Sequence, residues 1–182
     1  MPTPRTGAEA ATAAVRLPDG TPIRLRPIRP DDEPRWLSLF AACSAESVYA
    51  RFQYFFPWRS PGTAARFCAA DGRREIAWVA EPLPEDDPGL LGVGRLVVGR
   101  LHGSAEYALL VRDDWQCRGV GGALTRRCLD VAAERGLSRV VSRTTAANGG
   151  MLALLRRYGF ILSRSADGIW VEGIWSGGQE RC

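Results

Sequence analysis

A glycine-rich segment lies between an apolar run and an amphipathic stretch in the second half of the chain. Residues 116–123 read QCRGVGGA, residues 106–111 before them are typical of a buried strand, and residues 124–135 carry apolar side chains at helical spacing. A strand–turn–helix unit gathers free backbone N–H groups at the helix N-terminus, where the helix dipole favours an anion. Glycines let the ligand come close to the backbone. The segment therefore predicts a cradle for phosphate or pyrophosphate.

Other sequence features must support this prediction, because a glycine-rich turn can also serve only to reverse the chain. Two other phosphate-binding motifs are absent. The chain contains no lysine, which excludes the G-x-x-x-x-G-K-[ST] loop. The dinucleotide motif G-x-G-x-x-G is excluded by Leu124, which stands where the third glycine is needed.

Several motifs in the right order resemble those of the GNAT N-acetyltransferases. Gln116-x-x-Gly119-x-Gly121 matches the Q/R-x-x-G-x-G/A signature with which that family binds acetyl-CoA. Further matches lie in residues 23–33, in residues 139–148 and in the pair Gly159-Phe160, so that the resemblance covers most of the chain. Within the family, residues 28–34, 44–52 and 105–111 are most similar to the acetyltransferase domains of bacterial protein lysine acetyltransferases.

The alternation of strand and helix patterns, antiparallel at both ends of the chain, predicts a mixed α/β sheet. The resemblance implies the GNAT fold, with a mostly antiparallel sheet of about seven strands and about four flanking helices. In that fold the strand at 105–111 splays away from the strand at 139–144. Residues 1–14 are rich in Ala, Thr and Pro and are expected to form a disordered tail, and residues 15–178 are expected to form one acetyltransferase domain.

The resemblance also implies where acetyl-CoA binds. Its pantetheine arm would lie in the gap between the splayed strands, bonded by backbone groups, one of which polarises the thioester carbonyl. The expected cofactor-binding residues are Leu109, Leu110, Val111, Gln116, Arg118, Gly119, Val120, Gly121, Gly122, Ala123 and Asn148. The three apolar residues can also serve in packing alone, the Arg118 side chain either adds charge or points into water, and Asn148 either contacts the arm or caps its own helix.

Glu106 is the candidate general base. A lysine amine has a pKa near 10.4, so that only about one in 2,500 is neutral at pH 7. A carboxylate in a partly apolar cleft can accept the amine's proton. Glu106 corresponds to the catalytic glutamate of the lysine acetyltransferases that the chain resembles, although an exposed residue at a strand end, or one paired with an arginine, is the alternative.

The chain departs from the family pattern at the position of the general acid. Many GNAT enzymes place a tyrosine five residues before the phenylalanine of the GF pair, where it protonates the departing thiolate. Here that position is Leu155, and Tyr158 is expected to pack rather than to act in catalysis.

Composition excludes several other classes of function. All 24 basic residues are arginine, the net charge is +4, and no arginine-rich tract or zinc-finger spacing indicates nucleic-acid binding. Five cysteines without a C-x-x-C pair and a single histidine argue against a metal site. No apolar run is long enough to span a membrane, and the absence of a signal peptide predicts a cytoplasmic protein with reduced thiols.

The sequence thus predicts an acetyl-CoA-dependent N-acetyltransferase that acts on a primary amine, first of all a protein lysine. A small-molecule amine acetyltransferase and a non-catalytic acyl-CoA-binding module are the alternatives. An enclosed pocket lined by the aromatic residues at 49–58 would favour a small amine, and an open groove would favour a protein. By analogy with the family, a homodimer through the terminal strands is also possible.

Overall fold

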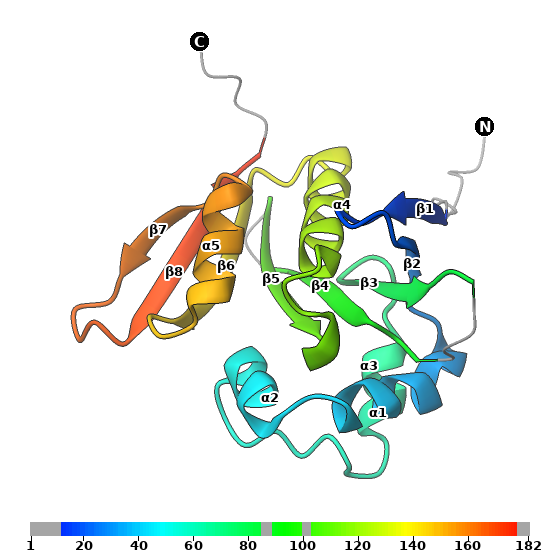
Figure 1. Cartoon of the computed structure of the whole chain (residues 1–182). Helices are drawn as coiled ribbons and strands as arrows, with labels where there is room; N and C mark the ends of the chain where they lie inside the picture. Colours follow the sequence, from blue (N-terminus) through cyan, green and yellow to red (C-terminus); the bar gives the residue numbers. More distant parts are fainter. Residues whose placement is uncertain (1–11, 85–88, 100–102, 178–182) are drawn as a thin grey trace, which may run out of the picture.

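The computed structural model describes residues 12–84, 89–99 and 103–177, and its strands form one eight-stranded sheet in the order β1-β2-β3-β4-β5-β6-β8-β7 (Figure 1). Every neighbouring pair is antiparallel except β5 and β6, which run parallel. The expected mixed, mostly antiparallel sheet is therefore confirmed, with eight strands in place of about seven. The strands are β1 (Ala13–Arg16), β2 (Pro22–Pro27), β3 (Glu75–Pro82), β4 (Gly92–Val98), β5 (Ser104–Val111), β6 (Arg139–Thr145), β7 (Ile161–Arg164) and β8 (Trp170–Ser176).

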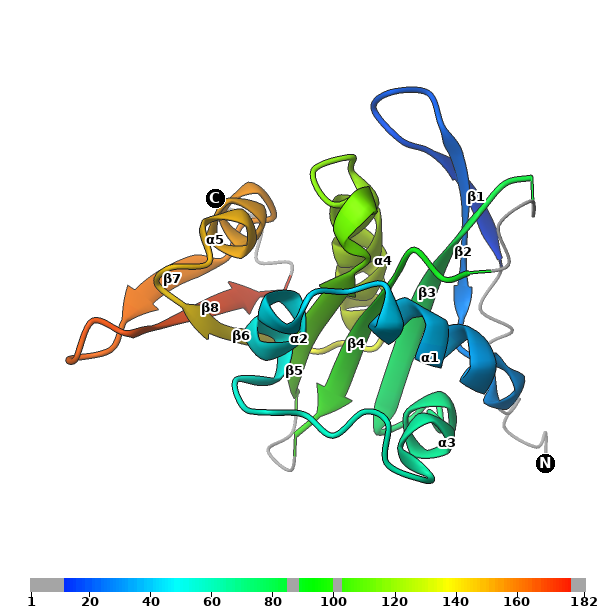
Figure 2. The same ribbon diagram turned by 60° about the horizontal axis from the view of Figure 1, so that its bottom comes forward.

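Helices cover both faces of the sheet, as Figure 2 shows. The α-helices of the described residues are α1 (Glu33–Ala41), α2 (Ala45–Phe52), α3 (Thr63–Cys68), α4 (Val120–Glu134) and α5 (Gly149–Arg157), and two short 3-10 helices are η1 (Pro30–Asp32) and η2 (Asp113–Trp115). The buried apolar side chains form two clusters, one containing the α4 residues and the other the α1 and α3 residues. None of the helices in these residues is long and apolar enough to cross a membrane.

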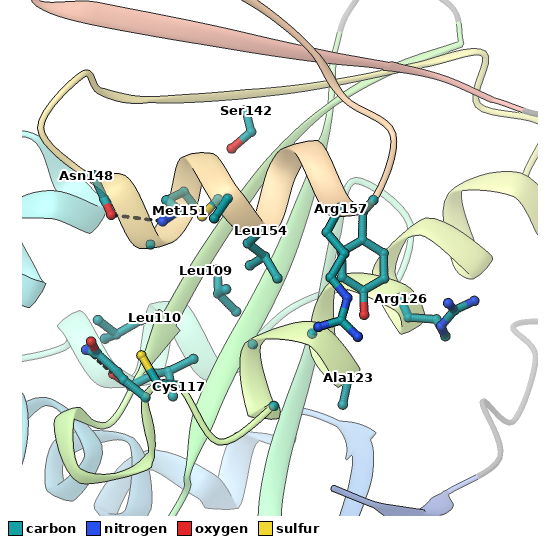
Figure 3. A pocket seen from close by; sticks show the side chains of 18 of the residues that line it. Leu109, Leu110, Cys117, Ala123, Arg126, Ser142, Asn148, Met151, Leu154 and Arg157 are labelled. Atoms are coloured by element: carbon teal, nitrogen blue, oxygen red, sulfur yellow. Dashed lines mark hydrogen bonds between the residues drawn. The ribbon is translucent and has the colours of Figure 1, made fainter. Parts of the chain in front are cut away.

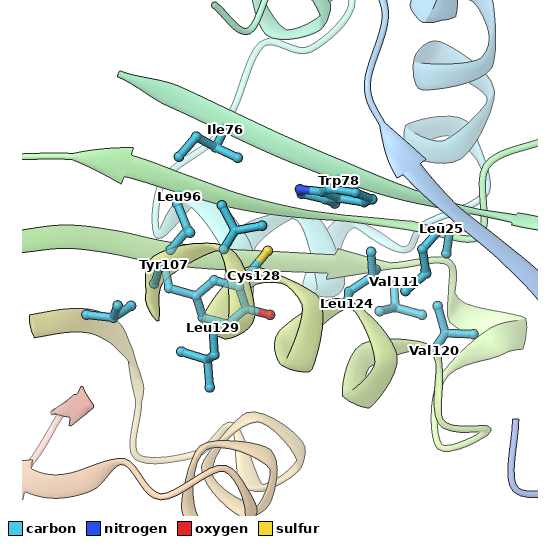
Figure 4. Close-up of a cluster of buried hydrophobic side chains, with 14 of the residues drawn as sticks. Leu25, Ile76, Trp78, Leu96, Tyr107, Val111, Val120, Leu124, Cys128 and Leu129 are labelled. Carbon is cyan, nitrogen blue, oxygen red and sulfur yellow. The ribbon is translucent and has the colours of Figure 1, made fainter. Parts of the chain in front are cut away.

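The apolar face of α4 holds the helix against the centre of the sheet. Leu124 and Cys128 are fully buried and lie in one cluster with Trp78 and Tyr107 of the strands (Figure 4). The Tyr107 hydroxyl is 2.8 Å from that of Thr125, which satisfies both buried polar groups. The helix follows Gly119, which has a φ of 103°, and it ends just before Gly136. The N-terminus of α4 is therefore fixed close to the carboxyl end of β5.

Strands β5 and β6 pair only over their first residues. The paired residues are Ser104 with Arg139, Ala105 with Val140 and Glu106 with Val141. Both strands then continue without pairing to each other, β5 to Val111 and β6 to Thr145, and they diverge in Figure 1. We call this divergence the fork. It confirms the splay between the two strands that the resemblance implied.

Helix α2 lies across the fork, in contact with both strands (Figure 2). At its N-terminal end the Ser44 N–H donates to Asp113 Oδ2 at 2.9 Å, and Gln116 Nε2 donates to Ser47 Oγ at 3.1 Å. At its C-terminal end Gln53 donates from Nε2 to the backbone carbonyl of Arg143 in β6, at 3.0 Å. The helix is therefore bonded both to the segment that follows β5 and to β6.

The boundary of the N-terminal tail needs a correction. Ala13 and Ala14, which the sequence assigned to a disordered tail, belong to β1 and pair with Leu25 and Arg24 of β2. Alanine has a low intrinsic preference for strands, and here the strand is formed by backbone pairing with a neighbour and not by side-chain preference. Residues 1–11 of the predicted tail lie outside the described residues.

A buried group of charges joins β2, β3 and the start of α1. Arg26 donates to both Asp32 oxygens at 2.7 Å and from Nε to Glu81 Oε2 at 3.0 Å, and all three residues are at most 4% exposed. Arg35 also reaches Glu81, at 2.7 Å. Burial opposes ionisation of Asp32 and Glu81, but the hydrogen bonds and charge of Arg26 outweigh it and hold the pKa of both carboxyls below its ordinary value.

Candidate active site

A cavity of about 580 Å³ opens at the fork, between β5, β6, α2, α5 and the start of α4 (Figure 3). The glycine-rich segment and the free part of β5 form adjoining parts of its wall, as the sequence led us to expect. The lining includes these predicted residues: Leu109, Leu110, Val111, Gln116, Gly119, Gly121, Gly122, Ala123 and Asn148. Residues from four separate regions of the chain are thus brought together around one space.

The first turn of α4 offers backbone N–H groups to this cavity. Ala123 N–H already bonds Gly119 C=O at 3.0 Å, whereas the N–H groups of Val120, Gly121 and Gly122 precede any acceptor within the helix. No side chain caps the helix at Gly119. These groups, together with the helix dipole, are suited to a phosphate or a pyrophosphate.

The glycines of the segment keep this end of the cavity open. A Cβ atom at Gly121 would lie 3.2 Å from Leu109 Cδ2, and one at Gly122 would lie 3.0 Å from the Tyr158 hydroxyl. A Cβ at Gly119 would meet Pro18 Cδ at 2.6 Å. Side chains at these positions would narrow the cavity or push the β1–β2 turn away from it.

The charged residues that line the cavity are all arginines: Arg16, Arg51, Arg126, Arg143 and Arg157. Since no aspartate or glutamate lies among the lining residues, the electrostatic potential of the cavity favours an anionic ligand. The described residues contain no group of three or more Cys, His, Asp or Glu side chains that could hold a metal ion.

Two predicted residues point away from the cavity. The Arg118 guanidinium pairs with Asp19 of the β1–β2 turn at 3.4 Å and stacks over the Trp115 ring at 4.0 Å. Its exposed side chain therefore lies outside the cavity lining, held by Asp19 and Trp115. Val120 is fully buried in the core, so only its backbone can face a ligand.

Asn148 takes the capping role that the sequence left open. Its Oδ1 accepts a hydrogen bond from the Met151 N–H at 3.1 Å at the start of α5, as the dashed line in Figure 3 marks. The residue also lines the cavity, and its Nδ2 group makes no hydrogen bond within the described residues. The cap fixes the side chain in place and leaves one polar end for a ligand.

Glu106 lies at the apex of the fork, in the last pair of residues that joins β5 to β6. It is exposed, and its negative charge offsets part of the lowering that burial imposes on the pKa of Arg51 in α2. It is not one of the residues that line the cavity. Leu155 is fully buried in the core and cannot donate a proton, whereas Tyr158 lines the cavity with its ring near Arg126.

Sequence reasoning missed two hydroxyl groups and one arginine. Ser142 and Thr144 of β6 are each 1% exposed, line the cavity and have no hydrogen-bond partner within the described residues. They lie two and four residues after the buried Val140 and therefore share its face of the strand, a pattern visible in the sequence. Arg51 of α2 also lines the cavity, and its helical spacing from Ser47 could have indicated this.

Comparison with known proteins agrees with this arrangement. A Pseudomonas aeruginosa protein named acetyltransferase PA5475 is 28% identical over 151 residues, which cover 83% of this chain and 81% of that protein. The crystal structure of the GNAT domain of S. lividans PAT is 30% identical, with a TM-score of 0.82 over 91% of this chain and 96% of that one. A cAMP-binding acyltransferase from Mycobacterium smegmatis is 26% identical with a TM-score of 0.59, and the match spans 90% of this chain but only 47% of that protein.

A family model extends the comparison beyond single proteins. The model of the acetyltransferase (GNAT) domain family matches residues 23–161, which include β3 to β6, all of β2 except Pro22, and all five α-helices of the described residues. The chain belongs to the GNAT acetyltransferase family.

Proposed function

We propose that the protein transfers an acetyl group from acetyl-CoA to the side-chain amine of a lysine in another protein. The observation that carries the proposal is the fork, because the cavity at the fork is lined by the start of α4 and by the free part of β5, the strand that carries Glu106. Family membership supports acyl transfer, and the similarity to PAT, a protein acetyltransferase, supports a protein acceptor.

The cavity residues fit acetyl-CoA, which when bound supplies an activated acetyl thioester. The N–H groups of residues 120–122 would hold its pyrophosphate, and the exposed Arg126 and Arg157 at the cavity rim would add charge. The backbone of β5 beyond Glu106 is unpaired on the β6 side and would bond the pantetheine amides. The buried hydroxyls of Ser142 and Thr144 are further polar partners within reach of this wall.

Glu106 would remove the proton from the acceptor amine. At pH 7 a lysine amine is almost wholly protonated, and making it neutral costs roughly 4.6 kcal/mol. A carboxylate at the apex of the fork can accept this proton directly or through one water molecule. A proton for the departing thiolate must come from water or from a side chain other than Leu155, since that position holds no ionisable group.

The exposed aromatic side chains favour a protein acceptor over a small amine. Phe52 and Phe56 stack on each other at 3.6 Å and pack against the α1–α3 cluster. Tyr49, Tyr54 and Phe55 instead face outward, with exposed fractions of 51%, 54% and 92%. None of these five residues lines the cavity, so they do not enclose a small ligand. An outward-facing aromatic surface beside the fork is suited to contact with another protein.

A transfer assay tests the proposal. The protein would be incubated with labelled acetyl-CoA and a fractionated cell extract, and label in proteins and in small molecules would be counted separately. Because this chain has no lysine, acetylation of its own lysine side chains cannot contribute to the count. Label in protein would support the proposal, and label only in small molecules would support an amine acetyltransferase. Binding of acetyl-CoA without transfer to either fraction would indicate a non-catalytic module.

The glycine at the start of α4 allows a separate test of the donor site. In Gly119→Ala the alanine would have to keep a φ near 103°. Its Cβ would also lie only 2.6 Å from Pro18 Cδ, which is a steric clash. We expect the affinity for acetyl-CoA to fall by about tenfold or more. A tenfold fall requires a loss of only about 1.4 kcal/mol of binding free energy, which a displaced α4 N-terminus would cause. Isothermal titration calorimetry with acetyl-CoA measures the change.

Gly136→Ala is the matched control for this substitution. Gly136 also has a positive φ, of 66°, but a Cβ there would meet nothing within 4 Å, and the residue lies beyond the far end of α4. The Gly136→Ala variant should lose about 1–2 kcal/mol of stability to backbone strain and should keep its affinity for acetyl-CoA. Equal loss of affinity in both variants would show that the geometry of the α4 start is not what binds the donor.

A further inference from the structure

Among the five arginines that line the cavity, Arg51 is half-buried, whereas the other four are exposed. It lies on the face of α2 that also carries Ser47 and Ala50 into the cavity lining. Within the described ranges it makes neither a hydrogen bond nor an ion pair, and its nearest aromatic contact is the Phe52 ring at 4.6 Å. By contrast, Arg16 donates to the Gly20 carbonyl at 3.1 Å and Arg143 pairs with Glu172 at 3.0 Å.

The charge of Arg51 is also partly removed from water, since the residue is half-buried. Burial, together with the positive charge of Arg95, lowers the pKa of Arg51 to about 10, and the charge of Glu106 offsets this only in part. A guanidinium removed from water without a hydrogen-bonded counter-ion is costly for the folded protein. Such a group is stabilised when a ligand brings a carboxylate into the cavity, because the planar guanidinium can bond both carboxylate oxygens.

The position of Arg51 places this binding group on the acceptor side of the fork. Helix α2 contacts β5 and β6 on the sheet face opposite α4, whose N-terminus forms the anion cradle. Glu106, the base of the proposed function, is the acidic residue whose charge acts on Arg51. Because α2, which carries Arg51, packs against β5, which carries Glu106, an amine at Glu106 lies beside the strand that α2 contacts.

A target lysine without an acidic neighbour is expected to bind poorly beside this cavity. Five arginines line the cavity and no acid does, so a cationic acceptor meets net repulsion. An acceptor that carries a carboxylate close to its lysine removes the repulsion and supplies the missing partner of Arg51.

We propose that Arg51 binds an aspartate or glutamate side chain adjacent to the target lysine, so that the enzyme selects lysines in acidic segments of its protein substrates. This inference rests on the proposed function and adds the chemical character of the acceptor to it. Arg51 acts here as a specificity residue, whereas Glu106 acts on the proton of the amine.

A library of single-lysine peptides tests the inference. Positions on both sides of the lysine would hold either Asp and Glu or their amide counterparts Asn and Gln, and acetylation with acetyl-CoA would be followed by mass spectrometry. For the wild-type protein we expect kcat/KM to be about tenfold higher for the acidic peptides, the usual scale of a charge-assisted hydrogen bond. In Arg51→Gln this ratio should fall close to one, and Arg51→Lys should give an intermediate ratio.

Arg143→Gln serves as the charge-matched control, because it removes one positive charge from the same cavity but from an arginine already paired with Glu172. It should keep most of the selectivity, and thermal unfolding of each variant verifies that it is folded. A loss as large as that of Arg51→Gln would attribute the preference to overall charge and overturn the inference.

Three further outcomes would also overturn it. Equal rates on acidic and amide peptides in the wild type would reject the inference and leave the proposed function standing. An equal loss on all peptides in Arg51→Gln would show that Arg51 acts on Glu106 and not on the acceptor. A strong preference for succinyl-CoA over acetyl-CoA that is lost in Arg51→Gln would place the bound carboxylate on the acyl group. Acetyl-CoA binding with no acetylation of any peptide or extract protein would instead overturn the proposed function itself.

Discussion

Glu106→Gln should reduce kcat/KM for acetyl transfer at pH 7 by about a hundredfold to ten-thousandfold, the contribution that a positioned general base makes. The substitution keeps the size of the side chain and removes its ability to take a proton. Glu106 is exposed, so the fold and the affinity for acetyl-CoA should be unchanged. Initial rates with a lysine peptide, together with calorimetric binding of acetyl-CoA, measure the two effects separately.

The pH dependence distinguishes loss of a base from other damage. As the pH approaches the amine pKa, near 10.4, the acceptor loses its proton without help and the difference between variant and wild type should shrink. Glu46→Gln is the control, because Glu46 is an exposed acid on α2. An unchanged rate in Glu106→Gln at pH 7 would remove this residue from the mechanism, and a loss that persists at high pH would point to a defect in acceptor binding.

The second large effect is expected for stability. Arg26→Gln leaves the buried Asp32 carboxylate without its two 2.7 Å bonds, while Glu81 keeps Arg35. Removing one partner of a buried charge cluster costs about 3–5 kcal/mol of the free energy of unfolding. Urea unfolding at pH 7 measures the change. Arg139→Gln breaks an exposed ion pair with Glu172 at 3.6 Å and should cost less than about 1 kcal/mol.

The stability difference between Arg26→Gln and the wild type should depend on pH, because the pKa of the buried Asp32 carboxyl differs between the two proteins. In the wild type the pKa of Asp32 lies below its ordinary value of 3.8, so the stability that Asp32 supplies is present above that pH and is lost as the pH falls through the lowered pKa. Without Arg26, burial dominates and raises the pKa of Asp32, so the penalty in the variant disappears once the carboxyl is protonated. The stability difference should therefore shrink as the pH falls from about 7 to below about 4. A difference that does not depend on pH would assign the loss to packing.

The sequence predicted the backbone of the site better than its side chains. The strand, glycine turn and helix around Gly119 were predictable because apolar periodicity and glycine act locally. The orientation of Arg118 was not, since it depends on Asp19, which lies 99 residues away in the sequence. The place of Arg51 in the cavity wall was not predicted either, because it depends on how α2 packs against the sheet and not on the sequence of α2 alone.

The aromatic segment shows the same limit within the fold. Residues 52–56 place Phe52 and Phe56 in the core and leave Tyr54 and Phe55 exposed, although all four are large and apolar. Which of them turns inward depends on the space left by α1 and α3, and that space is set by residues elsewhere in the chain. The existence of the fork was predicted from the resemblance to a family, since no local sequence pattern indicates that two strands stop pairing after Glu106.

The fork also has a consequence for how such a protein can diverge. Beyond Glu106 the free N–H and C=O groups of β5 belong to its main chain, and only a substitution by proline would remove one of them. The wall opposite is made of side chains on α2, where Ser47, Ala50 and Arg51 can be exchanged without touching that main chain. Mutation can therefore alter which molecules are modified while leaving recognition of the donor intact, and one scaffold can acquire new acceptors without losing its chemistry on the way.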